Sequence, residues 1–179
     1  TDGWLNDVRQ GGMGDCYFLA AAASVSEKDD FFQTLFVNNR ISLNKGGIWA
    51  INTWVRGLPS LCVIDDQVPG QRSPLYANSG KDGALWVSLL EKCYAKTSGN
   101  YEYIGNGGWM PEGYAFLTGT PQIEYSSSSL SDTALVTLFK SVTTQRFFAS
   151  VAVEEANTYN LAEGHAYTFV SVCDIVKID

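Results

Sequence analysis

Apolar positions in the first half of the chain change their spacing, and each spacing predicts a different element. The segment ALWVSLLEKCYAKTSG (84–99) repeats apolar residues three and four positions apart, which predicts a helix with one apolar face. The segment DCYFLAAAASVSE (15–27) carries an alanine run of high helix propensity, and Asp15 is expected to cap its first turn. A shorter helix is predicted within 29–40 from the helical spacing of phenylalanine and leucine.

β-branched and aromatic residues predict strands elsewhere. Residues 46–57 and 58–69 are expected to pair as antiparallel strands around a Gly-Leu-Pro-Ser turn. In the last third, residues 146–155 and 165–178 read as two further strands, preceded by a helix in 131–142. The chain therefore mixes helices and strands in segregated regions, which indicates the α+β class.

A glycine-rich stretch separates the two regions. Residues 100–121 hold five Gly and two Pro in 22 positions, and this composition predicts an irregular connection. We place a boundary within it. The predicted parts are a helical lobe over residues 1–108 and a β-richer lobe over residues 109–179.

Composition narrows the function classes. The net charge is −7 and the pI is near 4.6, which disfavours nucleic acid or an anionic membrane as a partner. No run of about 18 to 20 apolar residues predicts a membrane span, and the first ten residues lack a signal-peptide layout, so a cytoplasmic location is expected. The cysteines are expected to be free thiols, with Cys62, Cys93 and Cys173 in the core, and their spacing predicts no structural metal.

Three residues suggest thiol chemistry. Cys16 begins a predicted helix, where unpaired amides and the helix dipole favour a thiolate. His165 is the single histidine and the natural base for such a thiol, although it lies 165 − 16 = 149 residues away. Gln10 precedes a flexible glycine loop and could direct its amide at an oxyanion beside Cys16. Without further context, a buried cysteine and a partnered core histidine are the alternative.

The sequence context resembles a known family. QGGMGDCYFLAAAAS is similar to the nucleophile motif of the calpain cysteine proteases, and GHAYTF is similar to the segment that carries their catalytic histidine. ALWVSLLEKCYAK, NGGWMPEGY and VIDDQVP resemble calpain core segments, so that the likeness covers nearly the whole chain.

This resemblance implies a papain-like two-lobe fold and an endopeptidase that forms an acyl-enzyme. It assigns Cys16 as nucleophile, His165 as general base and Gln10 as the oxyanion-hole side chain, while Gly108 and Gly164 offer backbone groups to an extended peptide. Trp109 and Met110 follow the glycines and could line a substrate subsite, with packing of an exposed loop as the alternative.

Two positions depart from the family pattern. Tyr17 stands where family members have Trp, which keeps an aromatic ring after the nucleophile. The family's orienting Asn lies some two dozen residues beyond the histidine, whereas this chain ends 179 − 165 = 14 residues after His165. A histidine without that partner lacks a group that fixes its tautomer and ring angle, so this fragment is expected to be poorly active, through truncation rather than natural loss of catalysis.

The family resemblance also implies calcium. The chemistry itself needs no cofactor, but calpain core lobes bind calcium as an activator, and Asp7 occupies the position of one ligand. The expected second acidic ligand is displaced to Asp82, and a site at Glu154 or Glu155 is a further hypothesis. Expected partners are protein or peptide substrates, with regulatory domains flanking this region in the full-length protein.

Two other functions stay open. A papain-like module that has lost catalysis would bind partners without an activated Cys16. A transglutaminase or acyltransferase would share the thiolate chemistry, but these families do not carry the QGGMGDC loop together with GHAY.

Overall fold

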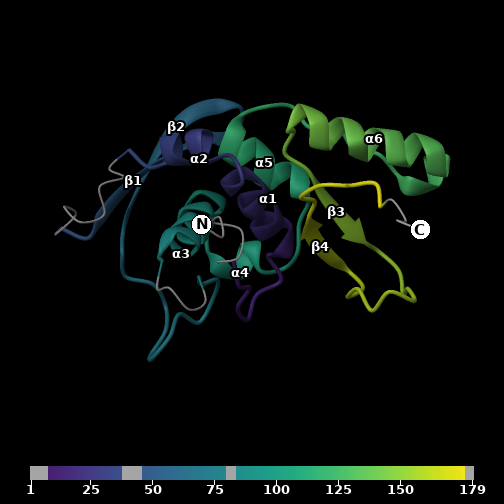
Figure 1. Cartoon of the computed structure of the whole chain (residues 1–179). Coiled ribbons are helices and arrows are strands. Elements are labelled where there is room, and N and C mark those ends of the chain that lie inside the picture. The colour runs from purple at the N-terminus through teal and green to yellow at the C-terminus, as the bar shows by residue number, and fades with distance from the viewer. Residues whose placement is uncertain (1–7, 38–45, 80–83, 176–179) are drawn as a thin grey trace.

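A computed structural model describes residues 8–37, 46–79 and 84–175 of the chain (Figure 1). Within them, helices and strands are mixed, as expected for the α+β class. The elements in chain order are α1 (Cys16–Ser26), α2 (Asp29–Leu35), β1 (Ile48–Val55), β2 (Leu58–Asp65), α3 (Trp86–Ser98), α4 (Tyr101–Ile104), α5 (Met110–Thr118), the 3-10 turn η3 (Ser127–Ser129), α6 (Asp132–Gln145), β3 (Ser150–Val153) and β4 (His165–Thr168). The part of the chain described contains no helix that is long and apolar enough to cross a membrane.

Helix α1 lies at the centre of the molecule, with the β1–β2 hairpin and α2 on one side and α6, β3 and β4 on the other (Figure 1). All its residues after Cys16 are buried. Its alanines allow neighbouring elements to approach closely, and α2, α3, α5, β3 and β4 all contact it. The helix predicted from the alanine run is confirmed, and elements from both halves of the chain pack on it.

Helix α5 replaces much of the irregular connection predicted for residues 100–121, and that prediction was wrong. The helix begins with Pro111 in its first turn, where proline lacks only an amide hydrogen that would be unpaired anyway, and it ends at Gly119 in a left-handed conformation. Gly113 lies in its middle. A Cβ atom there would come within 2.9 Å of the Ala21 side chain, so this glycine serves close packing on α1 rather than helix breaking.

The β1–β2 hairpin is antiparallel, as predicted, but its turn lies earlier than expected. Val55 pairs with Leu58, so that Arg56 and Gly57 form the two-residue turn. Both have positive φ, 51° and 76°, which suits the tight hairpin turn whose twist matches its strands. Pro59 therefore belongs to β2, opposite Trp54.

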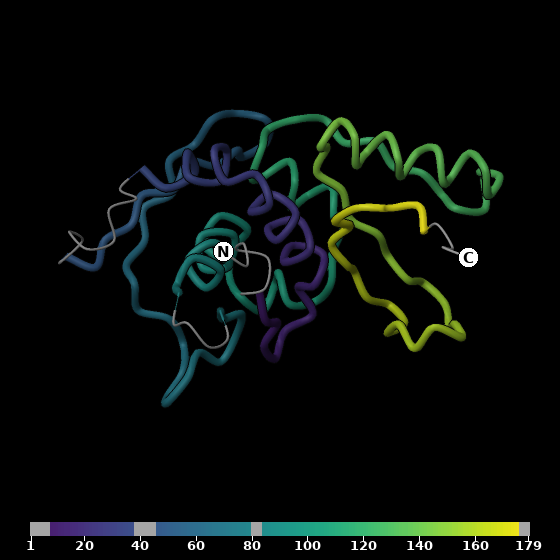
Figure 2. Tube along the Cα trace, in the orientation of Figure 1, coloured from purple at the N-terminus to yellow at the C-terminus, as the bar shows by residue number. Residues whose placement is uncertain are grey.

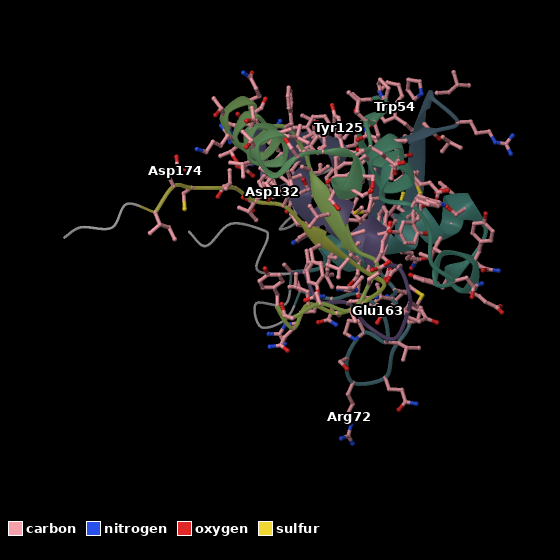
Figure 3. The ribbon with its side chains drawn as sticks, turned by 90° about the vertical axis from the view of Figure 1, so that its right-hand side faces the viewer. Trp54, Arg72, Tyr125, Asp132, Glu163 and Asp174 are labelled. Carbon is pink, nitrogen blue, oxygen red and sulfur yellow. The ribbon has the colours of Figure 1, made fainter. Side chains whose placement is uncertain are left out.

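The second sheet is shorter than the sequence suggested. β4 pairs with β3 over His165–Thr168 only, although the alternating pattern predicted a strand up to residue 178, whose last positions lie outside the described residues. After one more bond, from the amide of Phe169 to Ala149, the chain turns toward α6, where the rings of Phe139 and Phe169 stack. Figure 3 shows Asp174 on the extended segment that leaves the sheet.

The cysteines separate into two groups. Cys62 and Cys93 are buried in the core and Cys173 is exposed, so the expectation of a buried Cys173 was wrong. All four are free thiols, as expected. The predicted lobe boundary at residue 108 remains a prediction. Helix α5, which begins just beyond it, contributes Tyr114, Phe116 and Leu117 to the same core as α1.

Gly113→Val tests the close approach of α5 to α1. A branched side chain there meets Ala21 and the backbone of Phe18, and we expect a loss of about 2 kcal/mol in the free energy of unfolding from overpacking. Ala115→Val on the exposed side of the same helix is the control, with a loss below about 1 kcal/mol from helix propensity. Urea unfolding followed by tryptophan fluorescence measures both, and equal losses would contradict the packing role.

Candidate active site

Cys16 is the first residue of α1 and the one residue of that helix that is partly exposed. The amides of Phe18 and Leu19 both donate to the carbonyl of Asp15, which closes the first turn behind the thiol. The thiol therefore lies at the positive end of the α1 dipole, where negative charge that develops during a reaction is stabilised.

The loop before α1 is held by backbone contacts with two distant segments. The amide of Gly12 donates to Leu75 and that of Gly14 donates to Gly105, at 3.3 and 3.0 Å. A Cβ atom at Gly14 would lie 2.7 Å from the Gly105 oxygen, so only glycine allows this approach. Figure 2 shows the loop running beneath the centre of the molecule into α1. The shape of the loop is thus fixed by its contacts with these two distant segments.

Gln10 stands at the start of this loop. Its side-chain amide donates to the carbonyl of Met13, three residues on. One of its two amide hydrogens is therefore used to hold the loop, and the second is available to another acceptor. Beside it, Arg9 forms an antiparallel bridge with Asn78 through both backbone groups, which fixes the direction from which Gln10 enters the site.

His165 begins β4. Gly164 precedes it with φ of 62° and donates its amide to Val153, which closes the turn and starts the strand pairing at Val153 and His165. The imidazole meets the ring of Tyr167 edge to face, with centroids 4.8 Å apart. Figure 3 shows Glu163 on the connection that leads into this strand. No hydrogen-bond partner for the imidazole is found among the described residues.

Two hydrogen bonds dock the second sheet on α1. Thr168 donates its hydroxyl to the carbonyl of Ala20 at 2.8 Å, and Ser24 accepts the amide of Ala149 at 2.9 Å. Ala20 is one helical turn beyond Cys16, and Thr168 is three residues beyond His165. The docking therefore brings the two candidate catalytic residues to the same side of α1.

Gln10, Cys16 and His165 line one cavity of about 220 Å³. Its other walls are Val8, Leu19, Ala20, Ala23, Ala166, Tyr167 and Thr168. The sequence reasoning missed Tyr167 and Thr168, although the alternation of a strand places Tyr167 on the same face as His165 and could have indicated it. A nucleophile, a base and an amide donor in one partly apolar cavity suit attack on a carbonyl carbon.

The remaining predicted residues lie outside the walls of this cavity. Gly108 is exposed and packs over the ring of Tyr17, which is itself buried and donates its hydroxyl to Ile104. Trp109 is 68% exposed before α5. Gly164 uses its amide within the β3–β4 turn, so that only its carbonyl is free for a ligand.

The structure does not test the predicted calcium ligands. Asp7 and Asp82 lie outside the described residues, and Glu154 and Glu155 are both exposed just after β3. Across residues 8–37, 46–79 and 84–175, no group of three or more acidic, histidine or cysteine side chains is arranged to hold a metal ion. Calcium binding therefore stays a prediction.

The predicted capping role of Asp15 was wrong. Asp15 stands at the cap position of α1, but its side chain makes no capping hydrogen bond. It is fully buried, and its carboxyl shares a hydrogen bond with that of Glu91 on α3. Burial and the neighbouring Asp15 raise the pKa of Glu91 to about 9. The sequence pattern carries no signal for this contact.

Comparison with known proteins agrees with the site. The family model described as "Calpain family cysteine protease" matches residues 2–178. The chain is 34% identical over 179 residues to Calpain clp-4 of Caenorhabditis elegans, covering 94% of this chain and 25% of that protein. It is 32% identical over 181 residues to Calpain-A of Drosophila melanogaster, covering 95% of this chain and 22% of that protein.

A plant protein gives a similar match. The chain is 30% identical over 183 residues to the Calpain-type cysteine protease DEK1 of Zea mays, covering 95% of this chain and 8% of that protein. The chain thus spans a quarter or less of the length of these curated relatives. With the family model matching almost every residue, the chain belongs to the calpain family of cysteine proteases.

Proposed function

We propose that this chain is the papain-like catalytic part of an endopeptidase in which Cys16 attacks the peptide carbonyl and His165 transfers the proton. The observation that supports it best is the shared cavity: Gln10, Cys16 and His165 come from a loop, a helix start and a strand start, yet line the same 220 Å³ space. Membership in the calpain family supplies the protein substrate class.

The reaction follows from the positions of these groups. His165 takes the thiol proton, and the Cys16 sulfur bonds to the carbonyl carbon while its oxygen becomes an oxyanion. The imidazolium then gives its proton to the leaving amine as the carbon–nitrogen bond breaks, which leaves an acyl-enzyme. Water, deprotonated by His165, attacks the same carbon and releases the acid and the free thiol. The positive end of α1 and the free amide hydrogen of Gln10 favour the oxyanion.

The substrate is proposed to lie extended across the cavity. The free carbonyl of Gly164 and the exposed backbone of Gly108 would bind its main chain, and the exposed Trp109 ring would contact a side chain. Recognition through backbone groups predicts broad sequence preference. The proposal also includes an orienting group for the imidazole from a longer protein, which would carry the flanking regulatory domains. The length of the relatives, of which this chain covers a quarter or less, supports this part of the proposal.

Labelling with a peptide epoxide tests the nucleophile. We expect modification of Cys16 and none of Cys173, because Cys173 is exposed but has neither a helix dipole nor a base beside it. Mass mapping is done on this chain and on one extended past residue 179, each with and without calcium, and Cys16→Ser is the negative control. Calcium as an activator is supported if it raises labelling. Absence of labelling in both chains would favour the silent binding module.

His165→Ala tests the base. We expect peptide cleavage by the extended chain to fall about 10² to 10⁴-fold, the usual contribution of a general acid–base group. Substitution should leave the fold intact, because the imidazole is only partly buried and its one described ring contact is with Tyr167. Circular dichroism checks this. Cleavage at an unchanged rate would assign the proton transfer to another group.

Gln10→Ala tests the oxyanion donor. Loss of one such donor lowers kcat about 10² to 10³-fold. Alkylation of Cys16 by iodoacetamide forms no oxyanion, so its rate should change less than about threefold if the loop is intact. Gln122→Ala, which removes an exposed amide bonded only to Thr120, is the matched control. Equal losses in cleavage and alkylation would indicate that Gln10 only shapes the loop.

A further inference from the structure

Two buried carboxyl groups meet directly behind the candidate nucleophile. Asp15 is 0% exposed and Glu91 is 1% exposed. Among the described residues, no side chain other than that of Glu91 and no backbone group other than its own amide offers the Asp15 carboxylate a hydrogen bond. A hydrogen bond between the two carboxyls lowers the pKa of Asp15 and raises that of Glu91. The proposed reaction uses neither group, so this contact needs its own explanation.

Among the described residues, no cationic side chain is bonded to Asp15 or Glu91. Lys92, the neighbour of Glu91 on α3, directs its ammonium group to Asp65 at 2.6 Å. The titratable groups that face the pair from other elements are phenols: Tyr17 on α1 faces Asp15, and Tyr101 on α4, stacked on Tyr76, faces both carboxyls. One oxygen of Glu91 accepts the amide of Ala77 at 2.9 Å. Its other oxygen is left for Asp15.

We propose that Asp15 and Glu91 hold one proton between them, and that this carboxyl–carboxylate hydrogen bond positions the loop that presents Gln10 and Cys16. Two carboxylates in contact inside a protein cannot both stay ionised, because neither water nor a cation offsets their repulsion. With Oε1 of Glu91 accepting from Ala77, the proton belongs on Oε2, which donates to an ionised Asp15.

The ionisation of the two groups agrees with this arrangement. Burial and then Asp15 raise the pKa of Glu91 to about 9, and burial also raises the pKa of Asp15, while the hydrogen bond from Glu91 opposes that rise. Glu91 is thus the group that carries the proton at neutral pH. The folded state keeps this proton over a pH range in which the unfolded state, with an ordinary glutamate pKa near 4.3, has released it.

The pair reaches both ends of the loop. Asp15 is adjacent to Cys16 and accepts the first amides of α1 through its carbonyl. At the other end, Glu91 holds Ala77, and the next residue, Asn78, bridges Arg9, which adjoins Gln10. Ser88, one turn before Glu91, also donates to the carbonyl of Ala77. Helix α3 is therefore connected to both ends of the loop, to Asp15 through Glu91 and to Ala77 through Glu91 and Ser88, a positioning role that rests on the proposed function.

The shared proton can be tested without any protease assay. Glu91→Gln keeps an acceptor for Ala77 and a donor for Asp15 but cannot titrate. Because the wild-type folded state holds an extra proton, its unfolding equilibrium constant should rise about tenfold per pH unit between pH 6 and 8, relative to that of Glu91→Gln. The control is Glu102→Gln, an exposed acid on α4. Urea unfolding at each pH measures the ratio, and parallel pH dependence of wild type and Glu91→Gln would overturn the proposal.

The positioning role is tested by the pH profile of Cys16 alkylation. We measure iodoacetamide labelling of Cys16 relative to Cys173 in the wild type and in Glu91→Gln at each pH, and compare the two proteins, which removes the intrinsic pH dependence of each thiol. Above about pH 9, where the wild-type pair becomes doubly ionised, the wild-type ratio should fall at least threefold below that of Glu91→Gln. Equal ratios in the two folded proteins at every pH would overturn the positioning role. If the extended chain cleaves no peptide but the pH dependence of unfolding and that of Cys16 labelling are as expected, only the proposed protease function is contradicted.

Discussion

The burial of helix α1 on every side is the constraint from which the rest of the arrangement follows. A helix with residues 17–26 all buried can accept only small or well-packed side chains, and its alanine run meets that condition. On the neighbouring helix α5, Gly113 lets the backbone lie close to Ala21 and Phe18 of α1. Since the helix cannot shift without disturbing several neighbours, the residue at its N-terminus is held in a fixed place. Cys16 takes its orientation from this packing rather than from contacts of its own.

The site joins two parts of the chain that fold by different local rules. The loop carrying Gln10 is shaped by backbone bonds to residues 75 and 105, and His165 is placed by a strand pair with a tight glycine turn. Neither part contains the full chemistry. Their junction on α1 includes a few polar contacts, of which Thr168 to Ala20 lies nearest to the cavity. The geometry of nucleophile and base is therefore a property of the docking rather than of either part.

Sequence reasoning succeeded where a local pattern decides the structure. Helices α1 and α3 and the β1–β2 pairing followed from alanine content, helical spacing and β-branched residues. It failed where tertiary contacts override local preference: Gly113 was taken as a helix breaker, but its lack of a side chain serves packing. Asp15 looked like a cap because that role is local, whereas its real contact, Glu91, is 91 − 15 = 76 residues away. The three residues of the candidate site were identified mainly through a family resemblance, since spacing alone cannot show that residues 149 apart share a cavity.

The few polar bonds between the second sheet and α1 imply two levels of local stability within this one chain. β3 and β4 are only partly buried, and α6 has no buried residue among those described, whereas the residues of α1 after Cys16 are fully enclosed. Segments with few buried apolar contacts open more often than the core does. Amide hydrogens of β3, β4 and α6 should then exchange with solvent as one cooperative unit while those of α1 remain protected. His165 would then lie in a foldon that unfolds locally. Cys16 would lie in one that opens only when the whole core unfolds.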